Sequence, residues 1–177
     1  MIRNLTGLGG ITALLVLIAD QVVKYVVTGP LGLTQEGQEI AVLPIFTLRF
    51  VMNEGVSMGM LQAENDLMRW ALVAMTGAIA IAVAWWITRE TSRPDLFALG
   101  LVLGGAIGNI IDRIRFGYVV DYADLHFGDW SPFLVFNVAD AAISIGVVIL
   151  LARALLVRDK PQQQGGPSDS ATENVNA

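Results

Sequence analysis

Four apolar runs, each about the length of a membrane-spanning helix, constrain this chain more than any other feature of its sequence. They cover about residues 8–27, 68–87, 96–114 and 133–157. A helix rises about 1.5 Å per residue, so a hydrocarbon layer about 30 Å thick is crossed by about 20 residues. The runs predict an all-α polytopic membrane protein with four transmembrane helices. A mean hydropathy of +0.60 agrees with this interpretation.

Composition excludes several other classes. Only 15% of the 177 residues are charged, and the net charge of −5 is spread over loops and tail without a basic stripe, so no nucleic-acid partner is expected. The chain has no cysteine, which excludes disulfides, thiolate metal sites and cysteine nucleophiles. The first run begins like a signal peptide, but it continues through Asp20 and Lys24 with no small-x-small cleavage site, so we expect a retained helix.

The long connection at residues 28–67 has a different pattern. Residues 40–52 are rich in β-branched and aromatic side chains, and Phe46, Leu48 and Phe50 alternate with polar residues. This alternation predicts one or two short strands, with Pro44 indicating an edge, in a small extracytoplasmic β-sheet. The polar residues 158–177 predict a disordered cytoplasmic tail beyond the single membrane domain of residues 1–157.

Basic residues in the short loops predict the orientation. Arg3, Arg89, Arg93, Arg158 and Lys160 flank or follow the helices on one side. The segments on the other side are acidic. The positive-inside rule therefore places both termini in the cytoplasm and the acidic segments outside.

Four aspartates, Asp20, Asp112, Asp121 and Asp140, lie in or against the apolar runs. A carboxylate at the centre of a membrane helix costs about 2.5–3.5 kcal/mol, so such residues usually mark function. Asp20 and Lys24 are four residues apart on one helical face, and we expect a structural ion pair. Asp112 is likewise expected to be structural, with Arg113 as one potential partner.

Polar and small residues follow the third and fourth runs. Gly100, Gly104 and Gly108 have the spacing that lets helices pack closely. One face of the third helix carries Gly105, Asn109, Asp112 and Arg113, and one face of the fourth carries Asn137, Asp140 and Ser144. A polar stripe in so apolar a segment is expected to face a protein interior or a wet cavity.

Asp121 follows the third helix and Asp140 lies near the same end of the fourth, so the two carboxyls can meet. Like charges a few ångströms apart do not both ionise, and one carboxyl then keeps its proton near neutral pH. The charged group can take a proton from water while the protonated one polarises a peptide carbonyl. The sequence therefore predicts aspartic proteolysis on the extracytoplasmic side.

Other chemistries fit less well. His126 is the only histidine, so zinc-protease spacing is absent, and a serine–lysine dyad of Ser144 would need Lys24, which Asp20 already occupies. No metal or organic cofactor is expected. Two alternatives stay open: a small proton-coupled transporter using Asp20 and Asp140, and an assembly factor that uses the glycines to bind partner helices.

At this point the residues are similar to those of a known family, lipoprotein signal peptidase (signal peptidase II). The resemblance covers about residues 10–155. Its motifs occur in the family's order: Asp20-Gln21-x-x-Lys24, Asn53-x-Gly55, Gly104-Gly105-x-x-Gly108-Asn109-x-x-Asp112-Arg113, Val119-Val120-Asp121-Tyr122 and Phe136-Asn137-x-Ala139-Asp140.

The resemblance implies that Asp121 and Asp140 are the catalytic dyad of a bacterial inner-membrane aspartic endopeptidase. Such an enzyme removes the signal peptide of a prolipoprotein by cleaving on the amino side of a diacylglyceryl-modified cysteine, and we expect it to act as a monomer in the bilayer. The resemblance also implies supporting roles. Substrate binding or support of the dyad falls to Asn53, Gly105, Asn109, Arg113 and Asn137, and structural support to Asp20, Lys24 and Asp112.

One position departs from the family pattern. Met58 stands where the family commonly has phenylalanine, in a segment that is a candidate lid, and we expect altered contacts with lipid or signal peptide without loss of activity.

Overall fold

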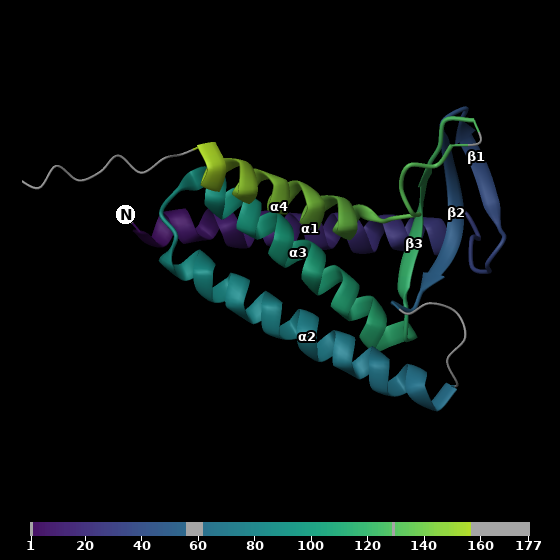
Figure 1. The fold of residues 1–177 in the computed structure, drawn as a ribbon, viewed down its shortest axis with the longest axis horizontal. Helices are drawn as coiled ribbons and strands as arrows, with labels where there is room; N and C mark the ends of the chain where they lie inside the picture. The colour runs from purple at the N-terminus through teal and green to yellow at the C-terminus, as the bar shows by residue number, and fades with distance from the viewer. Residues whose placement is uncertain (1, 56–61, 129, 157–177) are drawn as a thin grey trace, which may run out of the picture.

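The computed structural model describes residues 2–55, 62–128 and 130–156. Its elements are α1 (Ile2–Thr28), β1 (Glu39–Leu43), β2 (Phe46–Asn53), α2 (Gln62–Arg89), α3 (Arg93–Phe116), β3 (Val119–Leu125) and α4 (Val138–Leu156). All four helices are long and apolar enough to cross a membrane. Figure 1 shows them side by side, with the sheet at the end where α1 and α3 finish and α4 begins. The predicted fold class is confirmed.

The helix limits differ from those predicted, most clearly for α4. This helix begins at Val138 and not near residue 133. Phe136 instead pairs with β3, since its backbone N–H donates to Ala123 O at 3.0 Å and its carbonyl accepts from Ala123 N at 2.8 Å. An extended backbone that bonds to a strand cannot also be helical. The predicted tail, residues 158–177, lies outside the described residues.

A three-stranded antiparallel sheet in the order β1-β2-β3 lies at this end of the bundle. Pro44 falls in the turn between β1 and β2, outside both strands. The third strand, Val119–Leu125, was not expected from the sequence, and it is buried along nearly all of its length. β3 therefore ties the end of α3 to the sheet and carries Asp121 into the interior.

A bulge in β2 decides which residues face Asp121. Leu48 pairs with Ala123, and Val51 pairs with Asp121. Between these two pairs, β2 therefore contains one more residue than β3. Paired residues share a face of the sheet, and an extra residue reverses the faces that follow it. The bulge therefore places Asn53, two residues beyond Val51, on the same face as Asp121. Without it, Met52 would occupy that face.

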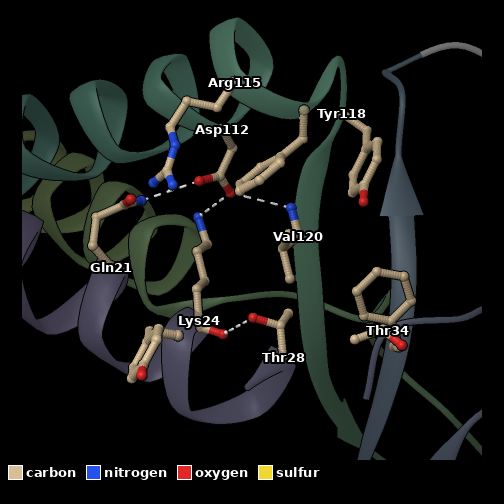
Figure 2. A pocket seen from close by; sticks show the side chains of 11 residues that line it. Gln21, Lys24, Thr28, Thr34, Asp112, Arg115, Tyr118 and Val120 are labelled. Carbon is tan, nitrogen blue, oxygen red and sulfur yellow. Dashed lines mark hydrogen bonds and ion pairs between the residues drawn. The ribbon is translucent and has the colours of Figure 1, made fainter. Parts of the chain in front are cut away.

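Close packing makes α3 the centre of the bundle, in contact with each of the other helices. A Cβ built on Gly100 would lie 2.6 Å from Gly9 O of α1, and Gly104 lies directly against the Ala13 carbonyl. At the sheet end of the same interface, Lys24 of α1 reaches Asp112 of α3 (Figure 2). The glycine spacing thus serves packing within this chain, as expected.

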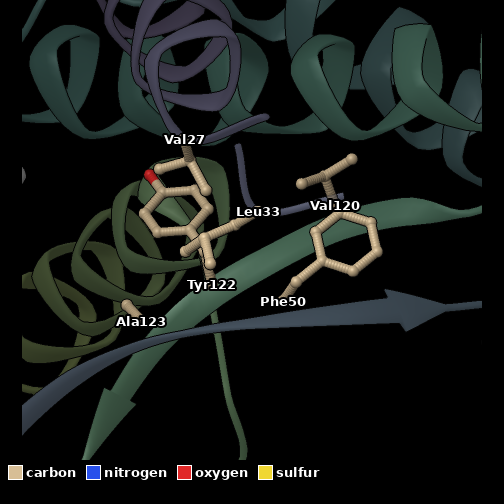
Figure 3. Close-up of a cluster of buried hydrophobic side chains, with 6 residues drawn as sticks. All are labelled: Val27, Leu33, Phe50, Val120, Tyr122 and Ala123. Carbon is tan, nitrogen blue, oxygen red and sulfur yellow. The ribbon is translucent and has the colours of Figure 1, made fainter. Parts of the chain in front are cut away.

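An apolar cluster joins the end of α1 to the sheet (Figure 3). Val27, Phe50, Val120 and Tyr122 are all at least 96% buried within it. Successive residues of a strand point to opposite faces, so Asp121, between Val120 and Tyr122, projects away from this cluster. The apolar contacts therefore hold β3 in the orientation that presents the carboxylate to α4.

Candidate active site

Asp121 lies in β3 with only 2% of its surface exposed. Its two oxygens accept hydrogen bonds from Asn53 Nδ2 at 2.9 Å and from Asn137 Nδ2 at 2.6 Å. Burial raises the pKa of Asp121 to about 7, with a further contribution from the neighbouring Asp140, while the two amide hydrogen bonds act in the opposite direction. This carboxyl can therefore hold a proton near neutral pH.

Asp140 lies in the first turn of α4, and Asn137 caps the helix. The backbone N–H of Asp140 donates to Asn137 Oδ1 at 2.9 Å, and the backbone N–H of Asn137 donates to Asp140 Oδ2 at 3.3 Å. This reciprocal pair is a capping box with aspartate in the position usual for glutamate. The capping box therefore fixes the Asp140 carboxyl at the start of α4.

Asn109 of α3 belongs to the hydrogen-bond network that links the two carboxyl groups. Its Nδ2 donates to Asp140 Oδ1 at 2.8 Å, and its Oδ1 accepts from Asn137 Nδ2 at 3.3 Å. Asn137 thus bonds Asp121 with its side chain and Asp140 with its backbone. The three asparagines proposed from the sequence, on β2, α3 and before α4, converge on the two aspartates.

Gly105 allows α3 and α4 to approach at this point. A Cβ built on Gly105 would lie 2.5 Å from Ala139 O and 2.8 Å from Ile143 Cγ1, both on α4. Any larger residue would force the helices apart. Since Asn109 lies one turn further along α3, the absence of a side chain at Gly105 sets the distance from Asn109 to Asp140.

A groove of about 270 Å³ lies beside the dyad, between α2, α3 and α4. Asn109 and Arg113 are its polar residues together with Thr76, and the rest of its lining is apolar: Ile79, Val102, Ala106 and Ile143. Arg113 Nε is buried with no hydrogen-bond partner among the described residues. A mainly apolar groove with a few convergent polar groups is the usual form of a site for an apolar ligand.

A buried ion cluster lies behind the dyad. Lys24 Nζ is 2.8 Å from Asp20, so the predicted ion pair within α1 is present. The same nitrogen is 2.7 Å from Asp112, which extends the cluster to α3 (Figure 2). Asp112 therefore pairs with Lys24 and not with its neighbour Arg113. Asp20 also accepts from the backbone N–H of Ala139 at 3.0 Å, which ties α1 to the start of α4.

Four further sequence expectations concern Ser144, Asn137, His126 and Met58. Ser144 lies four residues after Asp140 on the same helical face of α4, as expected, and it is exposed. Asn137 precedes α4 and acts as its cap, so it does not belong to a helical face. His126, expected at the surface, is half-buried and hydrogen-bonded to Thr47 at 3.1 Å. Met58 and the candidate lid around it lie outside the described residues.

Gln21, part of the first family motif, donates to both Asp20 and Asp112, at 3.2 Å and 3.0 Å. One contributor to the site was missed by sequence reasoning: Arg69 of α2 donates to the carbonyls of Arg113 and Ile114 at the end of α3. The capping box did have a signal, because asparagine followed three residues later by an acid is a helix-start pattern. No local pattern indicated the contact of Arg69.

The comparisons with known proteins decide the family. A family model described as signal peptidase (SPase) II matches residues 12–156. This chain belongs to the signal peptidase II family. It is 54% identical over 155 residues to a lipoprotein signal peptidase of Sphingopyxis alaskensis, covering 88% of this chain and 89% of the relative. It is 57% identical over 152 residues to one of Rhizorhabdus wittichii, covering 86% and 88%.

A solved structure described as a bacterial membrane enzyme superposes on this signal peptidase II with a TM-score of 0.72 at 29% identity, covering 87% of this chain and 95% of that one. Members of the family are aspartic proteases that remove signal peptides from prolipoproteins, and this chain is such a membrane-embedded enzyme. The comparisons give no support to the transporter interpretation.

Proposed function

We propose that Asp121 and Asp140 are the catalytic pair of this signal peptidase II, with the proton on Asp121 and the charge on Asp140. The observation that carries the proposal is Asn137, which bonds to both carboxylates at once. The division of roles follows from the surroundings. Burial favours the neutral form of Asp121, which leaves Asp140, at the start of α4, as the carboxylate that acts as the base.

In the proposed reaction, Asp140 takes a proton from water as the water oxygen attacks the carbonyl carbon of the residue before the modified cysteine. Asp121 gives its proton to the carbonyl oxygen, forming a gem-diol. Asp140 then gives the proton that it took from water to the leaving nitrogen, and Asp121 takes a proton back from a hydroxyl of the gem-diol as the C–N bond breaks. The products are a signal peptide with a new carboxylate and a lipidated cysteine with a free amino group.

We propose that the substrate is a prolipoprotein with a diacylglyceryl-modified cysteine. The groove between α2, α3 and α4 suits apolar chains, and the side chain of Arg113 lies at its polar end beside Asn109. The charge bias of the loops supports cytoplasmic termini and a dyad near the outer surface of a bacterial inner membrane. We propose that one copy of the chain is sufficient for the reaction.

The test is cleavage of a diacylglyceryl-modified precursor by detergent-purified protein, beside Asp121→Asn and Asp140→Asn. Asparagine matches the size of aspartate but can neither accept a proton from water nor donate an acidic one. We expect cleavage before the lipidated cysteine by the unsubstituted protein and a loss of at least 1,000-fold in kcat in both variants, a magnitude in line with that of other catalytic residues.

Ser144→Ala is the matched control, since Ser144 is an exposed polar residue of the helix that carries Asp140. It should cleave at the unsubstituted rate. Cleavage that survives either aspartate substitution would move the catalytic assignment to other residues while keeping the function. Folding of each variant is checked by its elution and its thermal unfolding in detergent.

A further inference from the structure

The side chain of Asn109 stands between the ion cluster of α1 and the dyad. Its Oδ1 lies 3.3 Å from Lys24 Nζ, and its Nδ2 lies 2.8 Å from Asp140 Oδ1. One amide therefore faces a cation on one side and a carboxylate on the other. Sequence reasoning had assigned Lys24 only to pairing with Asp20.

The two ends of an amide are chemically different, and the orientation of Asn109 matters for that reason. An ammonium group has three donors and no acceptor, so Lys24 can bond only to Oδ1. Nδ2 is then left for Asp140. The reversed amide would point its oxygen at the carboxylate and its N–H₂ at the ammonium, and both contacts would be repulsive.

Lys24 is held too firmly to release Asn109. It is 95% buried, its Nζ bonds to Asp20 and Asp112, and those carboxylates are themselves held by other donors. Asp112 also accepts from Gln21 and from the backbone N–H of Val120 (Figure 2). The position of the ammonium is therefore fixed by α1, α3 and β3 together.

The same polarity continues to the second carboxylate. Asn137 Oδ1 is occupied by the backbone N–H of Asp140, which leaves Asn137 Nδ2 to donate to Asn109 Oδ1 at 3.3 Å and to Asp121 at 2.6 Å. Both amides thus direct N–H groups toward the aspartates. Neither orientation is set by the carboxyl groups themselves: Lys24 Nζ donates to the Asn109 amide oxygen, and the backbone N–H of Asp140 donates to that of Asn137.

We propose that Lys24 is a positioning residue for the dyad: from α1 it sets the orientation of the Asn109 amide, and through it the direction of the hydrogen bond to Asp140. This rests on the proposed function of Asp121 and Asp140. Lys24 does not touch the reacting atoms, and its effect on catalysis passes through Asn109.

The test compares lysine, glutamine and methionine at position 24 in an Asp112→Asn background, which removes one of the two carboxylates that a lost cation would leave unpaired. Lys24→Gln and Lys24→Met are neutral and similar in length, but only glutamine can donate to Asn109 Oδ1. We expect Lys24→Met to lower kcat about 10–100-fold, the effect of a hydrogen bond to a charged group, with KM changed less than threefold. Lys24→Gln should stay within about threefold of the lysine background.

Adding Asn109→Ala to each of the three proteins completes a double-mutant cycle. If Lys24 acts through Asn109, Lys24→Met has little further effect once the amide is gone. Equal losses for glutamine and methionine, or losses that multiply with Asn109→Ala, would overturn the proposal. If the methionine variant does not fold, the glutamine variant decides, and a loss beyond about threefold there overturns it. The unsubstituted protein is assayed in parallel, so that its failure to cleave would be assigned to the proposed function.

Discussion

The hydrogen bond from Asn53 to Asp121 predicts a specific change in the pH dependence of cleavage. Asn53 Nδ2 donates to Asp121 Oδ2 at 2.9 Å and lowers the pKa of a carboxyl that burial has raised to about 7. The proposed mechanism requires a protonated Asp121, so activity is expected to fall as pH rises through about 7. Asn53→Ala removes the donor and leaves the carboxylate less stabilised.

The size of the shift follows from the strength of the bond. A hydrogen bond to a charged group contributes about 1.5–3 kcal/mol, and one pKa unit corresponds to about 1.4 kcal/mol. Asn53→Ala should therefore raise the alkaline limit of kcat by about 1–2 pH units. Over that pH range, the Asn53→Ala variant should remain active, whereas in the unsubstituted enzyme Asp121 has already lost its proton.

The assay is kcat for a lipidated precursor measured from about pH 5 to pH 10. Met52→Ala is the control, because Met52 is the adjacent residue on the opposite face of β2, and its profile should match that of the unsubstituted enzyme. An alkaline limit that stays in place or moves to lower pH in Asn53→Ala would refute the assignment of the proton to Asp121. A general loss of binding would raise KM without moving the limit.

Three further predictions address stability, packing and topology. The pKa of Asp121 is 3.8 in the unfolded chain and about 7 in the folded protein. Its contribution to the free energy of unfolding is therefore fully present below pH 4, and about 4 kcal/mol is lost as the pH rises through 7. Denaturant unfolding of Asp121→Asn in detergent should lack this pH dependence. Gly105→Ala should lower stability by about 1–3 kcal/mol and cleavage at least tenfold. Gly77→Ala on α2, where a Cβ meets nothing within 4 Å, should leave cleavage unchanged and should not lower stability, since alanine is favoured over glycine inside a helix by about 0.5–1 kcal/mol. Because the chain has no cysteine, Glu36→Cys should react with an impermeant thiol reagent added outside intact cells and Thr91→Cys should not, and the reverse pattern would contradict the proposed orientation.

Patterns within short stretches of the sequence predicted the secondary structure and the contacts between residues that are close in the chain. Hydrophobic length indicated the four helices, alternation indicated the strands of residues 40–52, and four-residue spacing indicated the pair of Asp20 and Lys24. The start of α4 was misplaced because residues 133–137 are apolar enough to extend the helical pattern. Their pairing with β3 depends on a strand that the sequence analysis did not recognise, although Val119, Val120 and Tyr122 are β-branched or aromatic residues, which are typical of β structure.

Such patterns could not predict contacts between segments that are far apart in the sequence. Asp112 lies one residue from Arg113 in the sequence, yet it pairs with Lys24 on another helix, because the glycines of α3 bring α1 close at that level. Helical periodicity shows which residues share a face but not which helix that face meets. The convergence of the three asparagines became plausible only through the family resemblance.

The bond between Asp20 and the backbone of Ala139 joins residues 119 positions apart. During synthesis, α1 enters the membrane long before α4 has been made, and Lys24 is the partner already present to neutralise Asp20. Asp112 arrives with α3, and the last partner of Asp20 arrives with the helix that carries Asp140. Asp20 thus gains its partners in the order in which the helices are synthesised. With Asp121 and Asp140 as the proposed catalytic pair, the nascent chain lacks that pair until its final helix is in place, and we expect the protease to be inactive throughout its own insertion.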